Sequence, residues 1–152
     1  MRRSSGRSQI VLDASFAVSV ILPELAGDDA APRLADWRRQ GTRLVAPMLW
    51  LGECVSAIRR RVYNRAISPE EGQGALEDLF ALQVEAIPMS PELCRSALAW
   101  AERLGQARAY DAFYLALAEQ FRTDLWTADR RLGNAAQQLG LDWVHWVGEG
   151  LS

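Results

Sequence analysis

Residues 9–22 read QIVLDASFAVSVIL, an apolar run of strand length followed by an aspartate and then a helix-like stretch. Gln9–Leu12 predicts a buried strand, and Ser15–Leu22 predicts a short helix that Pro23 stops. Short apolar strands continue to alternate with helical stretches along the rest of the chain. This order predicts strands that pair in parallel, with helices on both faces of the sheet. The predicted fold class is therefore α/β.

The same patterns predict the other elements. Strands are predicted at 43–46, 84–87 and 125–127, with a weaker last strand at 143–147. Helices, with their capping residues, are predicted at 28–40, 47–66, 68–82, 90–105, 110–121 and 130–139. Pro47 is placed in the first turn of its helix, where a missing N–H is tolerated.

Composition indicates one globular domain. The chain has 152 residues, enough for a substantial core and too few for two domains. Its apolar fraction of 49% and charged fraction of 24% are ordinary. The net charge of −2 gives no reason to expect indiscriminate nucleic-acid binding. A polyanionic substrate would have to be held by local arginines or through a metal.

Residues 1–8 are predicted to be a short disordered basic tail, 9–148 the folded domain and 149–152 a C-terminal tail. The start fails as a signal peptide because Asp13 interrupts the apolar stretch behind it. No apolar stretch approaches the roughly 18 residues that a membrane span needs. Cys54 and Cys94 form no C-x-x-C pair and lie in apolar helical patterns. They predict reduced core residues of a cytoplasmic protein.

Four acidic residues stand in mostly apolar stretches: Asp13, Glu53, Asp111 and Asp129. Asp13 and Asp129 lie just past the carboxyl ends of predicted strands, where parallel sheets gather their ligands. Asp111 falls in the first turn of its helix, where the helix dipole favours a carboxylate. Glu53 lies within a long helix, on a stripe that looks inward. Three of the four acids are therefore expected at one edge of the sheet, with the fourth facing it.

Carboxylates brought that close repel one another, and either some protonate or a divalent cation neutralises them. Oxygen ligands without His or Cys select Mg²⁺ or Mn²⁺, and His145 is the only histidine. A metal-bound water is a hydrolytic nucleophile, and the cation stabilises charge on a phosphoryl oxygen. The chemistry implied is hydrolysis of a phosphodiester.

Each acid also has a structural interpretation. Asp13 and Asp129 could simply cap the helices that follow them, and Asp111 could be a partner of the helix dipole. Glu53 could pair with Arg60 or another arginine. The tryptophans are more often core or interface residues than platforms for base stacking, and Trp37 or Trp50 near a dimer contact is equally admissible.

The motifs around the four acids resemble those of PIN-domain ribonucleases, above all the toxin subunits of VapBC toxin–antitoxin pairs. The resemblance rests on three segments that occur in the expected order over nearly the whole chain: IVLDAS at Ile10–Ser15, YDAFYLALA at Tyr110–Ala118 and WTADRRL at Trp126–Leu132, with Glu53 in its helix between the first two. One departure is Ser56, where related sequences often carry Asn.

The resemblance implies a three-layer α/β/α sandwich and a Mg²⁺-dependent endoribonuclease, with Mn²⁺ as an alternative metal. It assigns the acidic quartet to catalysis, with Asp13 and Asp111 as direct metal ligands. Glu53 and Asp129 would be ligands or act through water. Ser15 and Thr127 match the family's small hydroxyl positions that support the site.

The resemblance also implies a homodimer held inactive by a small antitoxin protein, with tRNA, rRNA or mRNA as substrate. Arg59, Arg60, Arg130 and Arg131 are expected to hold RNA phosphates, although each could equally belong to a solvated helix face. Two alternatives remain open. One is a PIN-like binding module with little or no nuclease activity, and the other is a metal-dependent DNA nuclease or phosphoesterase.

Overall fold

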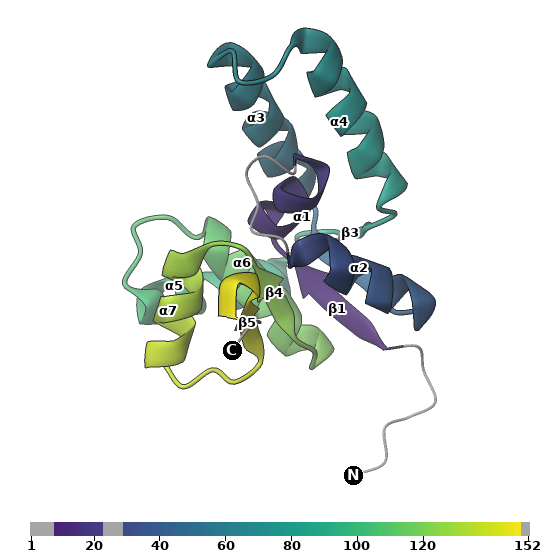
Figure 1. The fold of residues 1–152 in the computed structure, drawn as a ribbon. Coiled ribbons are helices and arrows are strands. Elements are labelled where there is room, and N and C mark those ends of the chain that lie inside the picture. The colour runs from purple at the N-terminus through teal and green to yellow at the C-terminus, as the bar shows by residue number, and fades with distance from the viewer. Residues whose placement is uncertain (1–7, 23–28, 150–152) are drawn as a thin grey trace.

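Five strands form one parallel sheet in the order β3-β2-β1-β4-β5 (Figure 1). The structure, a computed structural model, describes residues 8–22 and 29–149. The strands span β1 Gln9–Leu12, β2 Arg43–Pro47, β3 Glu85–Ile87, β4 Leu125–Thr127 and β5 Val144–Trp146. The chain runs outward from β1 to β3 and then returns to the other side of β1. The strand order therefore reverses between β1 and β4, and a crevice opens at such a point beyond the carboxyl ends.

Seven α-helices and one short 3₁₀ helix surround the sheet in the described residues. They are α1 Ala14–Ile21, α2 Ala30–Arg39, α3 Leu49–Tyr63, α4 Pro69–Ala81, α5 Pro91–Leu104, α6 Tyr110–Phe121, α7 Arg130–Gln138 and the 3₁₀ helix η2 Val147–Glu149. Helix α6 packs against β1, β2 and β4, with α5 against it, and α1 packs against β4 and helices α2, α3 and α4. The predicted α/β/α sandwich with a parallel sheet is confirmed.

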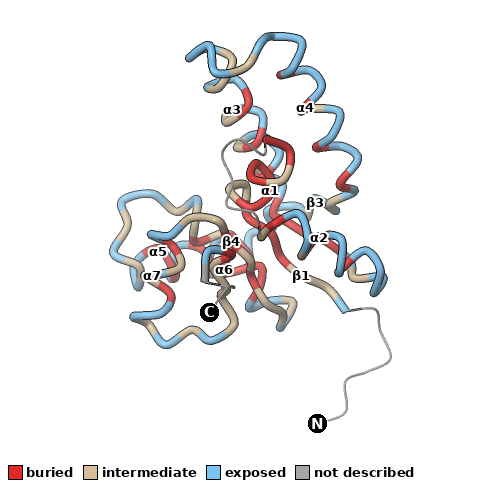
Figure 2. Tube along the Cα trace, viewed as in Figure 1, coloured by how far each residue is buried: buried red, intermediate tan, exposed pale blue. Residues whose placement is uncertain are grey.

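The core follows the sheet and the two helices that touch its centre (Figure 2). Val11, Leu12 and Leu125 on the central strands have no exposed surface. Helix α6 is buried over most of its surface, including Tyr114 and Leu115, and its alanines let it approach the strands closely. Because α6 is held so tightly, the first turn that carries Asp111 has a fixed place beside the sheet edge.

The α3–α4 pair extends away from the sheet, as Figure 1 shows. Ser68 begins α4 with the predicted capping box: its hydroxyl accepts from the Glu71 amide at 3.1 Å, and the Glu71 carboxylate accepts from the Ser68 amide at 2.8 Å. Glycine ends α5 as predicted, because Gly105 adopts a φ of 67° that other residues rarely take.

Pro47 was predicted in a helix, and this is wrong. It is the last residue of β2 and pairs with Ile87, and the next amide, that of Met48, donates to the Ile87 carbonyl at 2.9 Å. A proline can end a strand because its missing N–H is not needed there. Helix α3 therefore begins at Leu49, and it ends at Tyr63, three residues before the predicted 66, because Arg65 turns to a φ of 58°.

Other boundaries shift by one or two residues. The predicted helix at 28–40 begins at Ala30, and β3 begins at Glu85 rather than at Val84. Residues 1–7, Pro23, Asp28 and 150–152, on which parts of the predicted tails and boundaries fall, lie outside the described residues. Ser8 belongs to the described part, and its carbonyl accepts from the Arg43 amide at 2.8 Å.

One of the two cysteines departs from the prediction. Cys54 is buried, and burial raises the pKa of its thiol, so it stays protonated as a core residue. Cys94 is exposed, because it lies on the outer face of α5.

Trp37, Trp50 and Trp100 are buried core residues. Among the described residues, no helix is both long and apolar enough to cross a membrane.

Candidate active site

The four predicted acids come from the positions that the topology favours. Asp13 follows β1 and Asp129 follows β4, on the two sides of the point where the strand order reverses. Asp111 lies in the first turn of α6, and Glu53 in the second turn of α3. Asp13 is buried, whereas the other three are half-buried.

Asp13 accepts three hydrogen bonds at the start of α1. Its Oδ1 accepts from the Phe16 amide at 2.9 Å and from the Ser15 hydroxyl at 2.7 Å, and its Oδ2 accepts from the Thr127 hydroxyl. Burial raises the pKa of Asp13 to about 6, although all three hydrogen bonds act in the opposite direction, and the charge of Asp111 raises it further. Asp13 therefore caps α1 and is also a buried carboxylate whose ionised form a cation would stabilise.

Ser15 and Thr127 connect Asp13 to the turn that bears Asp129. The Ser15 hydroxyl accepts from the Ala128 amide at 2.9 Å, and the Thr127 hydroxyl accepts from the Asp129 amide at 2.9 Å. The two hydroxyl oxygens lie 3.2 Å apart. The resemblance implied such a supporting place for these residues, and this network ties the ends of β1 and β4 together.

Asp129 caps α7 and lies close to an arginine. Its Oδ1 accepts from the Arg131 amide at 2.9 Å, and its Oδ2 is 3.4 Å from a guanidinium nitrogen of the same residue. The capping interpretation of Asp13 and Asp129 is thus confirmed for both. It does not exclude a functional one, because only one oxygen of each carboxylate caps a helix. The other oxygen accepts from Thr127 in Asp13 and lies near Arg131 in Asp129.

Asp111 is held by a side chain from the loop before its helix. Its Oδ2 accepts from the Gln106 side-chain amide at 3.2 Å. Burial raises the pKa of Asp111, the Gln106 hydrogen bond opposes this, and the charge of Asp129 raises the pKa further while Arg131 lowers it.

The Glu53 carboxylate is held in place by a buried tyrosine. The Tyr114 hydroxyl donates to Oε1 of Glu53, and Tyr114 is only 1% exposed. Burial raises the pKa of Glu53, the Tyr114 hydrogen bond opposes this, and the charge of Asp111 raises it further. The inward stripe predicted for Glu53 is confirmed by this hydrogen bond. Among the described residues, Glu53 forms no ion pair or hydrogen bond with Arg60, its predicted alternative partner.

Asp111 is the centre of the group. Its charge raises the pKa of Asp13 and of Glu53, and its own pKa is raised by Asp129. Within residues 8–22 and 29–149, however, no three Asp, Glu, His or Cys side chains are arranged to hold a metal ion between them. The acids are therefore neighbours that repel one another, without forming a closed cage of three ligands.

This arrangement fits a magnesium-type site better than a calcium or zinc site. Mg²⁺ keeps several waters and binds one or two carboxylates directly, so it does not need three protein ligands. The donors are oxygens only, and the sole histidine, His145, pairs with Asp124 at 3.2 Å and stacks on Trp126 instead. Burial is the main cause of the raised pKa values of Asp13, Glu53 and Asp111, and the charge of a neighbouring acid adds to each of them. A divalent cation beside these carboxylates would favour their ionised forms.

Comparison with known proteins identifies the family. The PIN domain model matches residues 10–138, so the chain belongs to the PIN-domain family. Ribonuclease VapC12 of Mycobacterium tuberculosis is 34% identical over 130 residues, covering 83% of this chain and 91% of the relative.

Solved structures show the same fold. VapBC2 from Rickettsia felis, bound to a DNA fragment from its promoter, has a TM-score of 0.64 at 15% identity and covers 90% of this chain and 97% of its own. VapC20 of Mycobacterium tuberculosis, a toxin that cleaves the sarcin–ricin loop, has a TM-score of 0.60 at 16% identity and covers 83% of this chain and 94% of its own.

Two residues of the site were missed from the sequence. Tyr114 holds Glu53, and Gln106 holds Asp111. A signal for Tyr114 existed, because it lies three residues after Asp111 on the same face of one helix. Gln106 lies in a loop whose path no periodicity predicts.

Proposed function

We propose that this protein is a divalent-metal-dependent endoribonuclease that acts as the toxin of a toxin–antitoxin pair. The observation that carries the proposal is the position of Asp111, whose charge couples to Asp13, Glu53 and Asp129 at the crevice of the sheet. Relatives that match most of the chain are named VapC ribonucleases, which favours RNA over other phosphodiesters.

Asp13 and Asp111 would be the direct ligands of Mg²⁺ or Mn²⁺. Glu53 and Asp129 would bind the metal directly or through its waters. When bound, the metal supplies an activated water and stabilises negative charge on the phosphoryl group. Ser15 and Thr127 would keep the Asp13 carboxylate in place, because their hydroxyls donate to both of its oxygens.

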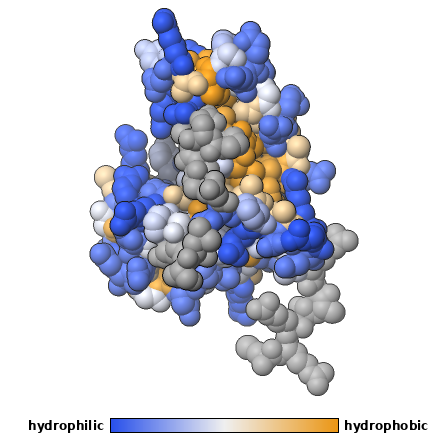
Figure 3. All heavy atoms as spheres, viewed as in Figure 1, coloured by the Kyte–Doolittle hydropathy of each residue, from blue (hydrophilic) through white to orange (hydrophobic). Residues whose placement is uncertain are grey.

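The protein partner proposed is a small antitoxin, and the protein itself is proposed to be a homodimer. Figure 3 shows apolar side chains gathered around the α3–α4 pair. Met48, Leu51, Val55 and Phe80, which lie at or within these two helices, are between 38% and 53% exposed, and apolar side chains that gather in a patch are typical of interaction surfaces. The proposed partners would cover this surface. A structural neighbour from Klebsiella pneumoniae, which is a toxin–antitoxin complex, supports the idea of an antitoxin.

The substrate class proposed is a folded cellular RNA: tRNA, rRNA or mRNA. Arg59, Arg60, Arg130 and Arg131 remain the predicted phosphate contacts. The protein's net charge of −2 means that binding to RNA must rely on such local groups.

The test is cleavage by the purified protein of RNA, single-stranded DNA and a small phosphodiester, each with Mg²⁺, Mn²⁺ or EDTA. We expect cleavage of RNA alone, only with a metal, and a loss of at least about a hundredfold in Asp13→Asn. Asp142→Asn, at an exposed acid outside the site, is the matched control and should cleave normally.

Equal cleavage by wild type and Asp13→Asn would contradict the site. Cleavage of DNA or of the small phosphodiester at the same rate as RNA would mean that the protein is a broader phosphoesterase and not a ribonuclease. RNA binding without cleavage under any metal condition would favour a binding module.

A further inference from the structure

Helix α3 carries a basic side chain on the same face as Glu53. Arg60 follows Glu53 by seven residues, so its direction around the helix differs by only about 20° and it lies about 10 Å further along the axis. Arg60 is exposed. Val62, nine residues after Glu53, points to the opposite side, and it lines the groove between α3 and α4. The Glu53–Arg60 face is therefore turned away from α4.

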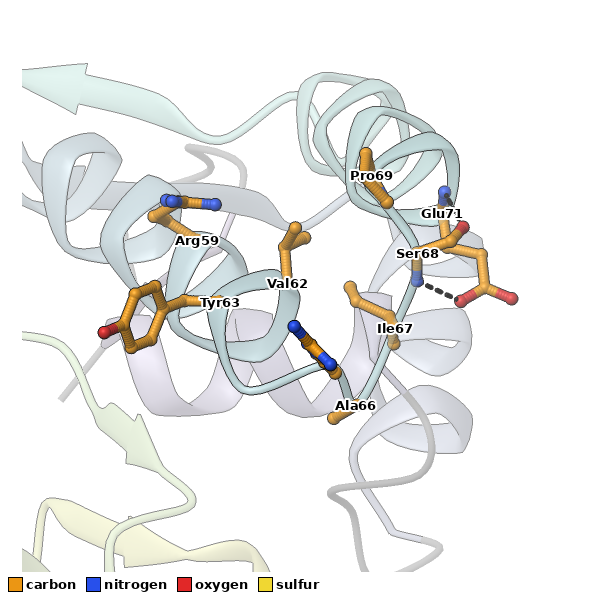
Figure 4. Close-up of a pocket in the computed structure, with 9 residues that line it drawn as sticks. Arg59, Val62, Tyr63, Ala66, Ile67, Ser68, Pro69 and Glu71 are labelled. Atoms are coloured by element: carbon orange, nitrogen blue, oxygen red, sulfur yellow. Dashed lines mark hydrogen bonds between the residues drawn. The ribbon is translucent and has the colours of Figure 1, made fainter.

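Arg59 has a different position although it is the next residue. It lines a pocket of about 620 Å³ at the end of the α3–α4 pair, and its guanidinium lies 5.6 Å from the centre of the Tyr63 ring. Figure 4 shows Arg59 and Tyr63 on the α3 side of this pocket, with Pro69 across it. This pocket faces α4, whereas Glu53 faces the crevice.

The other predicted phosphate contacts are already engaged. Arg131 lies 3.4 Å from Asp129, and Arg130 lies 5.7 Å from the centre of the Trp146 ring. In the part of the chain that the structure describes, the Arg60 guanidinium makes no hydrogen bond, ion pair or ring contact. A guanidinium group whose N–H donors are free binds phosphate oxygens well, because it can form two parallel charge-assisted hydrogen bonds.

We propose that Arg60 is a phosphate-binding residue that holds the RNA strand on the α3 side of the active site. This inference rests on the proposed function. Arg60 lies about 10 Å along the helix axis from Glu53, so it contacts a backbone phosphate that flanks the active site and not the scissile phosphate itself. The contact is to the backbone, so it increases affinity for RNA without selecting its sequence.

The test measures binding of a single-stranded RNA to variants of the intact protein that carry Asp111→Asn, which keeps the RNA uncleaved. With Arg60→Ala we expect a three- to tenfold weaker affinity, and a slope of log Kd against log salt that is smaller by about 0.7. Arg60→Lys should restore part of the affinity but not all of it, since an ammonium lacks the two parallel donors. In otherwise wild-type protein, Arg60→Ala should raise KM and leave kcat nearly unchanged.

Two variants serve as comparisons. Arg39→Ala removes the same charge from the last turn of α2, which leads to the opposite edge of the sheet, and it should leave affinity and salt slope at their original values. Arg59→Ala removes the neighbouring charge, and its effect should be less than half that of Arg60→Ala. Equal effects of Arg60→Ala and Arg39→Ala would overturn the proposal.

The binding arm separates this inference from the proposed function. If the wild-type protein cleaves no RNA but its RNA affinity depends on Arg60, the proposed nuclease activity is wrong and the phosphate-binding role of Arg60 still holds. If Arg60→Ala weakened binding of a co-expressed protein partner and left RNA affinity unchanged, the residue would belong to a protein interface, and the proposal would be wrong.

Discussion

The carboxylate of Asp13 accepts hydrogen bonds from Ser15, Thr127 and the Phe16 amide, and burial still raises its pKa to about 6. A group whose pKa is higher in the folded state than in the unfolded chain holds its proton more tightly when folded. Its contribution to stability is complete below pH about 4 and is lost as the pH rises through about 6. At neutral pH, without a metal, this carboxylate therefore opposes folding.

Asp13→Asn should consequently stabilise the metal-free protein at pH 8. An amide needs no charge in the buried site, and it can still accept from Phe16 while it donates to the Thr127 hydroxyl. We expect a gain of about 1–3 kcal/mol in the free energy of unfolding at pH 8, which shrinks to near zero at pH 4. Urea unfolding in EDTA at both pH values measures it, with Asp142→Asn as control. A variant that is less stable than wild type at pH 8 would show that the hydrogen bonds of Asp13 outweigh its burial.

Tyr114→Phe tests how Glu53 is held. The change removes only the buried hydroxyl that donates to Glu53, so stability should fall by about 1 kcal/mol. Without this hydrogen bond Glu53 is less well positioned. We therefore expect kcat to fall about tenfold and the metal concentration needed for half-maximal rate to rise. Tyr63→Phe is the control, since Tyr63 is 72% exposed. An unchanged metal dependence in Tyr114→Phe would mean that Glu53 is positioned by other contacts.

At this scale the sequence could predict which acids matter, but not what holds them. Asp13 and Asp129 stand next to recognisable strands, and the hydroxyls of Ser15 and Thr127 lie two residues away from them. The partners of Glu53 and Asp111 depend on the packing of α3 against its neighbours and on the path of one loop. The helical spacing of Asp111 and Tyr114 gives a signal for the partner of Glu53, whereas the loop that carries Gln106 gives none for the partner of Asp111.

At the scale of elements, two glycines of α4 allow a test of how closely helices α3 and α4 pack together. A Cβ added at Gly72 would lie 2.7 Å from a methyl carbon of Val62, whereas one at Gly74 would meet nothing within 4 Å. Gly74→Ala should therefore stabilise the protein by up to about 1 kcal/mol through helix propensity. Gly72→Ala should destabilise it by about 1–3 kcal/mol, because α4 must move away from α3.

Thermal unfolding of these two variants gives the comparison. Both changes are the same and lie two residues apart in one helix, so propensity cancels between them. If Gly72→Ala were as stable as Gly74→Ala, the close approach of α3 and α4 would be wrong.

The elements themselves could largely be predicted. Apolar runs and capping signals predicted each strand and each α-helix, and the errors concern ends such as that at Pro47. A proline is acceptable both in the first turn of a helix and at the end of a strand, so its neighbours in space decide. Here the pairing of Pro47 with Ile87 on β3 decided for the strand.

For the whole molecule, the strand order explains why residues so distant in sequence meet. The reversal between β1 and β4 opens a crevice at their carboxyl ends, and Asp13 and Asp129 stand on its two sides. The alternation of strands and helices predicted a parallel sheet, but the order β3-β2-β1-β4-β5 came from the structure. Without that order, the sequence could not show that the four acids lie together.

The central claim is that these acids share one divalent cation. It is tested most directly by titrating Mn²⁺ into the wild-type protein, Asp111→Asn and Asp142→Asn, with binding followed by calorimetry. Asp111 couples to the other three acids, so its loss should weaken Mn²⁺ binding at least about tenfold, while Asp142→Asn binds as the wild type does. Equal Mn²⁺ affinity in Asp111→Asn and the wild-type protein would contradict the account.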